Sequence, residues 1–368
     1  MDHDSLSFYW TVACGSTRKA IRVASNPDDE ADEFATIDLD PADVPEPEYA
    51  MVSHATKNNI PFEGPKWMID SGGYSTLASN PEYESSVEEY VDYLTKYEDR
   101  IERYVLRDWA CEPDLLREWD RDVRQHQNWT IRDHVACREQ VNDRGLDMEP
   151  VAVLQGYELE DYLWHYEYLR QHGLLTDHLG IGSICRRGQE QQMQSLLLQV
   201  RQEIPDRITL HGFGVKKTVL EDPDVVDALD TVDSNAWENR VSRNPNTPNG
   251  WEPTIRAYVD YREDLCDRLR RAEAKSGGIQ VFSLGEWTTS YVDEDVEALV
   301  ECVCGNLLDP NGLDRNDAAC RHCERWLLNR QLQEVADPIK RNEQKATGPA
   351  GKSPEPSPAE SGTADTTA

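Results

Sequence analysis

Short apolar runs alternate with amphipathic segments along most of the chain, and this alternation constrains the fold more than any other feature. Apolar residues return every three or four positions in segments 87–97, 159–171 and 192–203, as in surface helices. The β-type runs are residues 9–14, 49–53, 67–70, 104–106, 151–154, 179–181, 208–210 and 231–233. Eight alternating units predict a closed (β/α)8 TIM barrel, with an open doubly wound sheet as the alternative. Residues 279–284 are a candidate ninth strand.

Polar residues and glycines follow the carboxyl ends of six of these runs. In order they are Asp70-Ser71-Gly72-Gly73, Asp108-Trp109-Ala110-Cys111, Gln155-Gly156, Gly182-Ser183, His211-Gly212-Phe213-Gly214 and Asp233-Ser234-Asn235. One such motif would be an ordinary polar turn, since glycines suit tight turns. Barrel enzymes build their active sites at this end of the strands, so six motifs in succession predict a site there.

The chain is strongly acidic over its whole length. Its 368 residues include 70 Asp and Glu against 38 Lys and Arg, a formal net charge of −32. Such a charge keeps a protein soluble in concentrated salt, which indicates the cytoplasm of a halophilic archaeon or its virus. The first residues lack the pattern of a signal peptide, and no apolar run is long enough to span a membrane, so we expect a soluble cytoplasmic protein.

Four of the nine cysteines lie close together near the C-terminus. Cys302 and Cys304 form one pair, and Cys320 and Cys323 form a second pair after fifteen intervening residues. Two thiolate pairs joined by a loop match tetrahedral Zn²⁺, so we predict a structural zinc site, with His322 as an alternative to one sulfur. A redox role for the second pair would leave the first pair without a purpose. We expect the other five cysteines to be packing residues.

These features divide the chain into three predicted parts. Residues 1–290 form the TIM barrel and residues 291–338 the zinc-binding subdomain, in which residues 293–303 read as a helix. Residues 339–368 have no periodic apolar residues, and we expect a disordered acidic and polar tail, because such a sequence buries too little surface to offset its ordering entropy. The nine histidines suggest no catalytic metal site, and His126, His134 and His211 are predicted to be structural.

The strand-end motifs, taken in order, resemble the tRNA-guanine transglycosylase superfamily. The motifs that carry the resemblance are Asp70-Ser71-Gly72-Gly73-Tyr74, Asp108, Leu154-Gln155-Gly156, Ile181-Gly182-Ser183, Val232-Asp233-Ser234 and the cysteines. Some positions depart from the family pattern, including Ser75, Ser183 and the Cys185-Arg186-Arg187-Gly188 segment. Together with the lack of an appended RNA-binding domain, these departures resemble the DpdA-type branch, which inserts 7-deazaguanines into DNA.

The resemblance implies a double displacement. Asp233 would attack the sugar C1′ as the nucleophile and expel guanine, and Asp70 would act as general acid/base toward an incoming 7-deazaguanine such as 7-cyano-7-deazaguanine. Asp108 would accept hydrogen bonds from the guanine N1–H and amino group. The other substrate-binding residues implied are Ser71, Gly72, Gly73, Tyr74, Gln155, Gly156 and Gly182.

Basic residues gather in loops after the predicted strands, against the acidic background. They are Arg186, Arg187, Lys216, Lys217, Arg240 and Arg243, and we predict that they contact nucleic acid. We favour DNA over tRNA as the substrate. Surface charge without a ligand is the alternative for any one of them.

Other functions are open at this point. Two carboxylates also suit a barrel glycoside hydrolase, and a non-catalytic nucleic-acid-binding paralogue would keep the fold without the chemistry. The sequence also leaves open a homodimer or a partner subunit.

Overall fold

The computed structural model describes residues 6–27, 30–56, 59–188, 190–244, 248, 250–276, 300–301 and 307–308. The chain divides into two compact units, Met1–Ala298 and Leu299–Ala368. Among the described residues, no helix is long and apolar enough to cross a membrane.

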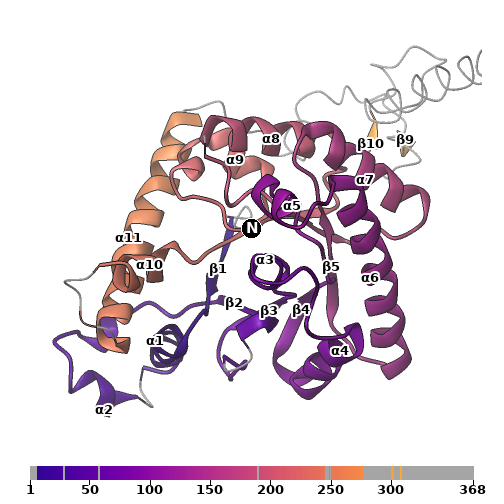
Figure 1. Ribbon diagram of the computed structural model, residues 1–368. Coiled ribbons are helices and arrows are strands. Elements are labelled where there is room, and N and C mark those ends of the chain that lie inside the picture. The colour runs from indigo at the N-terminus through magenta and orange to yellow at the C-terminus, as the bar shows by residue number, and fades with distance from the viewer. Residues whose placement is uncertain are drawn as a thin grey trace, which may run out of the picture. The chain divides into compact units, whose positions relative to one another are not determined.

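The first unit is a closed barrel of eight parallel strands in sequence order, which confirms the predicted TIM barrel (Figure 1). All eight predicted runs lie in or overlap a strand. The strands are β1 (Ser7–Thr11), β2 (Tyr49–Ser53), β3 (Lys66–Asp70), β4 (Ile101–Val105), β5 (Glu149–Leu154), β6 (His178–Ile181), β7 (Thr209–Gly212) and β8 (Thr231–Ser234). The first strand pairs with the last, so the described barrel has no open sheet edge.

Helices surround the barrel, and each of the three predicted helical segments coincides with or overlaps one. The helices are α1 (Gly15–Ser25), α2 (Ala31–Phe34), α3 (Gly73–Leu77), α4 (Val87–Lys96), α5 (Pro113–Glu118), α6 (Val123–Arg144), α7 (Leu159–Gln171), α8 (Glu190–Glu203), α9 (Pro223–Ala228), α10 (Ala236–Ser242) and α11 (Trp251–Ser276). Short 3-10 helices cover Pro41–Asp43, His54–Thr56, Glu98–Arg100 and Val219–Glu221. In Figure 1 the short helices α3 and α5 lie inside the ring of longer helices, because they belong to the connections that leave the carboxyl ends of β3 and β4.

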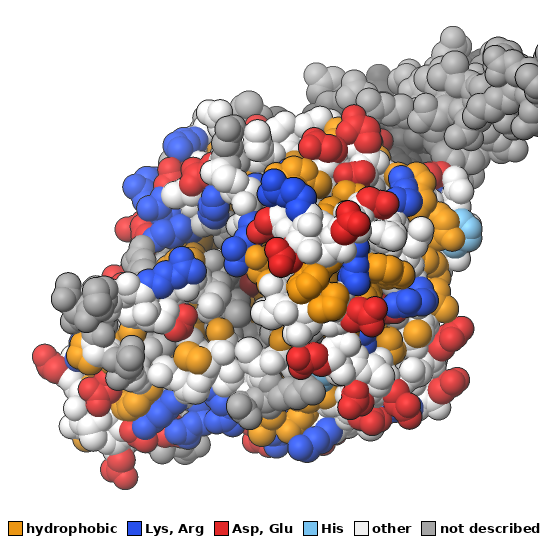
Figure 2. Space-filling model, in the orientation of Figure 1, with side chains coloured by type: hydrophobic (Ala, Val, Ile, Leu, Met, Phe, Trp, Pro, Cys, Tyr) orange, Lys and Arg blue, Asp and Glu red, His pale blue; other side chains and the backbone are white. Residues whose placement is uncertain are grey.

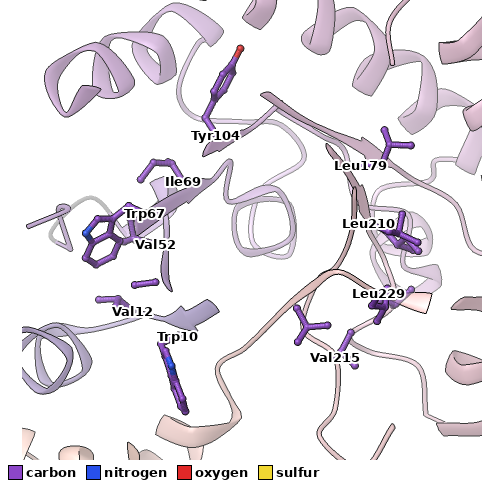
Figure 3. Packing of buried hydrophobic residues seen from close by; sticks show 14 of the residues in the cluster. Trp10, Val12, Val52, Trp67, Ile69, Tyr104, Leu179, Leu210, Val215 and Leu229 are labelled. Atoms are coloured by element: carbon purple, nitrogen blue, oxygen red, sulfur yellow. The ribbon is translucent and has the colours of Figure 1, made fainter. Parts of the chain in front are cut away.

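Alternation along each strand separates an inner core from an outer one. The outer core joins strands to helices, and Figure 3 shows members such as Trp10, Trp67 and Leu210. The inner core fills the barrel with Tyr9, Met51, Met68, Val105, Val151 and Val153. Since side chains two positions apart share a face, the residues two positions after Met68 and Tyr9 also point inward. These are Asp70 and Thr11, and the barrel therefore aims the ends of its strands at a common centre.

Most of the predicted C-terminal features lie outside the described residues. These are the ninth strand at 279–284, the cysteines Cys302, Cys304, Cys320 and Cys323, and the tail at 339–368. The second unit contributes β9 (Val300–Glu301), paired antiparallel with β10 (Leu307–Leu308). The expectation of a helix across 293–303 is therefore wrong at residues 300–301, where backbone pairing with β10 favours a strand. The zinc site and the domain boundaries stay predictions.

Candidate active site

Asp233 projects from the end of β8, and both of its carboxylate oxygens accept hydrogen bonds. Thr11 Oγ1 donates to Oδ2 at 3.0 Å, and the amide of Gly214 donates to Oδ1 at 2.7 Å. His211 Nε2 lies 3.4 Å from the same Oδ1. The residue is 5% exposed, so groups from β1 and from β7 and the loop after it fix the carboxylate in one orientation. His211, predicted to be structural, thus contacts the predicted nucleophile.

The loop after β7 needs glycine at position 214 to reach Asp233. Gly214 has a φ of +63°, and a Cβ there would lie 2.6 Å from the Cβ of Cys185. Both the left-handed backbone and the crowding exclude a larger residue. The amide that binds Asp233 is therefore positioned by the close approach of the β6 and β7 loops.

Asp70 ends β3 beside two other acids. Burial raises the pKa of its carboxyl to about 7, and the nearby charges of Asp108 and Asp233 add to the rise. Hydrogen bonds from the amide of Gly72 and the hydroxyl of Ser53 act in the opposite direction. A carboxyl with this pKa exchanges protons near neutral pH, which suits a general acid/base.

The paired glycines after Asp70 permit a turn that a side chain would block. Gly72 has a φ of +81°, and a Cβ there would lie 2.7 Å from the Cβ of Ala55. At Gly73 a Cβ would lie 2.8 Å from the carbonyl oxygen of Asp108. The glycines therefore bring the exits of β3 and β4 into direct contact.

Asp108 is buried after β4, and both of its carboxylate oxygens accept hydrogen bonds. Ser71 Oγ donates to Oδ1 at 2.6 Å, and Gln155 Nε2 donates to Oδ2. Burial raises the pKa of Asp108, whereas these two hydrogen bonds lower it. Each oxygen keeps a further lone pair, so the carboxylate can still accept two parallel N–H groups from a ligand.

Gln155 is held against the backbone of the neighbouring strand end. A Cβ on Gly182 would lie 2.4 Å from Gln155 Nε2, so only glycine admits the amide here. Ser183, with a φ of +53°, donates through its hydroxyl to Gln155 Oε1 at 2.6 Å. Gly156 makes similar room for α7, because a Cβ there would lie 2.7 Å from the Cβ of Asp161. The structure thus brings together Asp108, Gln155 and Gly182, three of the residues for which the family resemblance implies base binding.

A fourth acid, Glu112, joins this cluster and was missed by sequence reasoning. It is 2% exposed, and its Oε2 lies 3.0 Å from Ser183 Oγ. Burial raises the pKa of Glu112 to about 7. The available signal was its place in the same strand-end segment as Asp108, just before Pro113 begins α5.

Helix α6, also not predicted, anchors the segment between Asp108 and Glu112. Thr130 Oγ1 accepts from the amide of Trp109 at 2.9 Å, and Asp133 accepts from the Trp109 indole at 2.9 Å. Because α6 packs under this loop, the two acids at its ends are fixed relative to each other.

Tyr74 and Arg186 form a cation–aromatic pair. The Arg186 guanidinium lies 4.4 Å from the centre of the Tyr74 ring, and Arg186 is exposed whereas Tyr74 is half-buried. An exposed cation over an aromatic ring is a platform on which a base or phosphate can rest.

The other predicted nucleic-acid contacts differ in their surroundings. Arg187 is buried and donates to the carbonyl oxygen of Tyr157, and Lys216 Nζ donates to the carbonyl oxygen of Arg187 at 2.9 Å. Lys217 pairs with Asp264 of α11. Arg243 is exposed, whereas the side chain of Arg240 lies outside the described residues. All of these nucleic-acid contacts stay predictions, and Arg186 has the most suitable setting.

Comparison with known families agrees with this geometry. The family model described as DpdA, DeoxyPurine in DNA protein A, matches residues 48–307, more than half of the chain. The chain belongs to the DpdA family. The family consists of transglycosylases that act on DNA, so the resemblance inferred from the strand-end motifs is confirmed. No curated protein matches the chain.

The family match covers β2 through β8 and thus the acids from Asp70 to Asp233. Thr11 on β1 lies before the matched range, yet the barrel closure brings it to Asp233. Among the residues that the structure describes, no group of three or more His, Cys, Asp or Glu side chains could hold a metal ion. The four cysteines predicted to bind zinc fall outside that part of the chain.

Proposed function

We propose that this protein exchanges guanine in DNA for a 7-deazaguanine base through a covalent intermediate on Asp233. One observation carries the proposal: Asp70 lies within electrostatic reach of both Asp108 and Asp233 at the centre of a barrel whose strands direct all three acids to one end. Membership in a DNA-acting transglycosylase family supports DNA rather than tRNA.

The first half of the reaction breaks the bond between C1′ and N9 of guanine. A carboxylate oxygen of Asp233 bonds to C1′ while the bonding electrons leave with guanine, and a proton from Asp70 neutralises the departing base. The hydrogen bonds from Thr11 and Gly214 keep the Asp233 carboxylate aimed. The product is a glycosyl ester on Asp233.

In the second half of the reaction the ester bond breaks, a new bond forms between C1′ and N9, and Asp70 accepts a proton instead of donating one. Asp70, now ionised, takes the N9 proton of the incoming base, N9 bonds to C1′, and the ester electrons return to Asp233. The base must leave the helical stack to reach this site, and Asp108 then recognises its N1–H and amino group. Tyr74 provides a ring on which the base can stack.

Basic and acidic side chains are interspersed on the face seen in Figure 2, despite the net charge of −32. Polyanionic DNA therefore meets cations on this face even though the whole chain would repel it. Arg186 is the cation whose place next to Tyr74 best fits a strand entering the site.

The direct test incubates the protein with DNA, or separately with tRNA, that carries labelled guanine. With 7-cyano-7-deazaguanine added in concentrated salt, we expect DNA to lose label and to gain the deazaguanine. Without the added base, release of more than one labelled guanine per protein molecule would indicate a glycosidase instead, because the covalent intermediate accounts for one. No label loss from either nucleic acid would contradict the proposed function.

Replacing Arg186 with Ala is expected to weaken DNA binding and to lower the slope of log affinity against log salt by about one, because one phosphate contact is lost. The matched control is Arg270→Ala, which removes the same charge from a side chain that is 73% exposed and paired with Asp267. Binding measured across a salt series distinguishes them. Equal slopes for both variants and the unaltered protein would remove Arg186 from the DNA contact.

A further inference from the structure

Glu112 has no part in the proposed exchange, yet it is among the most buried carboxyl groups near the site. Its side chain does not cap α5, although the residue stands at the helix N-terminus. Instead Oε2 approaches Ser183 Oγ at 3.0 Å, and Oε1 lies 3.9 Å from Cys185 Sγ. This buried acid therefore contacts the base-recognition cluster, which consists of Asp108, Gln155, Gly182 and Ser183.

The hydrogen-bond directions in this cluster follow from counting protons. Gln155 Nε2 donates to the Asp108 carboxylate, so the opposite atom of the amide, Oε1, faces Ser183 and needs a donor. Ser183 has one hydroxyl proton, and Gln155 Oε1 at 2.6 Å receives it.

The two lone pairs of Ser183 Oγ then accept from two other groups. The amide of Cys111 donates to Oγ at 2.7 Å. The remaining neighbour is Glu112 Oε2, and a carboxylate facing a lone pair would be repelled. The contact is a hydrogen bond when Glu112 carries a proton and donates it to Ser183.

We infer that Glu112 is a positioning residue that acts as a neutral acid, donating to Ser183 and, through Gln155, fixing the Asp108 carboxylate for recognition of the base. Ionisation of Glu112 draws the Ser183 proton away from Gln155. Gln155 Oε1 then loses its donor, and a second negative charge lies near Asp108. The base-binding cluster is therefore assembled at lower pH and loosened at higher pH. The inference rests on the proposed function, because it takes Asp108 to recognise the base.

The surroundings of Glu112 favour its neutral form. The titratable groups that interact with it are Asp108 and Cys111 after β4, Asp114 on α5, Cys185 after β6, Tyr74 on α3 and Tyr162 on α7. Burial raises the pKa of Glu112 and the charges of Asp108 and Asp114 add to the rise, whereas the hydrogen bond from its own backbone amide, and the Ser183 proton that the ionised form attracts, lower it. The nearby cations are directed elsewhere, since Arg186 stacks on Tyr74 and Arg187 donates to Tyr157. Glu112 thus titrates in the neutral range, the same range as Asp70.

The test measures binding of free 7-cyano-7-deazaguanine to the full chain by calorimetry between pH 6 and 8.5. We expect binding to the unaltered protein to weaken by about tenfold over this range, since a buried acceptor left unsatisfied costs on the order of that factor. Glu112→Gln stays neutral and keeps a donor for Ser183, so its affinity should match that of the unaltered protein at pH 6 and lose most of the pH dependence. Glu112→Leu has similar size without a donor and should bind weakly at every pH.

Two further variants separate the roles of neighbouring groups. The same titration in an Asp70→Asn background removes the contribution of Asp70, and the difference between Glu112 and Gln should persist there. Ser183→Ala removes the hydroxyl that links Glu112 to Gln155, so it should also remove the pH dependence of base binding. Equal pH profiles for the unaltered protein and Glu112→Gln, with tight binding in both, would overturn this inference alone. No binding by the unaltered protein at any pH would overturn base recognition by Asp108 and the inference with it.

Discussion

Replacing Asp233 with Asn is expected to abolish base exchange, lowering the rate by about three orders of magnitude or more, because an amide cannot form the glycosyl ester. Asn is nearly the same size and can still accept from the amide of Gly214 and donate to Thr11 Oγ1, so the fold should persist. The measurement is a single-turnover assay together with denaturing electrophoresis. In the absence of incoming base, the unaltered protein should accumulate a covalent protein–DNA species that the variant lacks.

The control for this experiment is Asp206→Asn, which removes one charge from a side chain that is 92% exposed and distant from the strand ends that carry the site. It should exchange base at the normal rate. A covalent species that persists in Asp233→Asn would assign the nucleophile to another residue and contradict the proposed mechanism.

Replacing Asp70 with Asn is expected to slow the transfer of the incoming base by roughly 10²–10⁴-fold, the usual contribution of a general acid/base. The covalent species should still form and accumulate, because the nucleophile is intact. Guanine release should slow less than transfer if the leaving base can take a proton from water. Pre-forming the covalent species and then adding 7-cyano-7-deazaguanine measures the second half directly.

The pH dependence of the transfer rate in that second half is an independent test of Asp70 as the base. Transfer requires ionised Asp70, and the pKa of this carboxyl is about 7, so the rate should rise with pH through neutrality and level off above it. Asp70→Asn should show no such rise. With the incoming base saturating, a profile that falls with pH in the unaltered protein, or that is unchanged by the substitution, would exclude Asp70 as the base.

Asp70 and Glu112 both titrate near neutral pH, and their ionisation is expected to affect the reaction in opposite directions. Raising the pH should speed deprotonation of the incoming base by Asp70, while it weakens base binding through Glu112. Transfer of a limiting concentration of base to the pre-formed covalent species should therefore pass through a maximum near neutral pH. At saturating base, only the rising side of this transfer profile should remain.

Much of the barrel could be predicted from sequence because strand burial and strand ends leave local signals. Met68 and Asp70 stand two positions apart, so the same period that buries one directs the other into the barrel. Gly72 and Gly73 mark a turn whose backbone and crowding admit no side chain. Helix α6 was not predicted, although its 22 residues include those that hold the loop after β4. Its buried face includes polar residues such as His126, Thr130 and Asp133, so apolar periodicity is a poor guide to it.

The sequence by itself determined the strands, the order of the acids along the chain and the resemblance to a transglycosylase family. Only the tertiary structure decided which groups touch them. Thr11 and Asp233 are 222 positions apart, and they meet because β1 closes the barrel against β8. Glu112 reaches Ser183 across 71 positions through the packing of two loops. Local patterns report burial and turns, whereas a hydrogen bond between distant segments depends on the register of a closed sheet, which no local pattern contains.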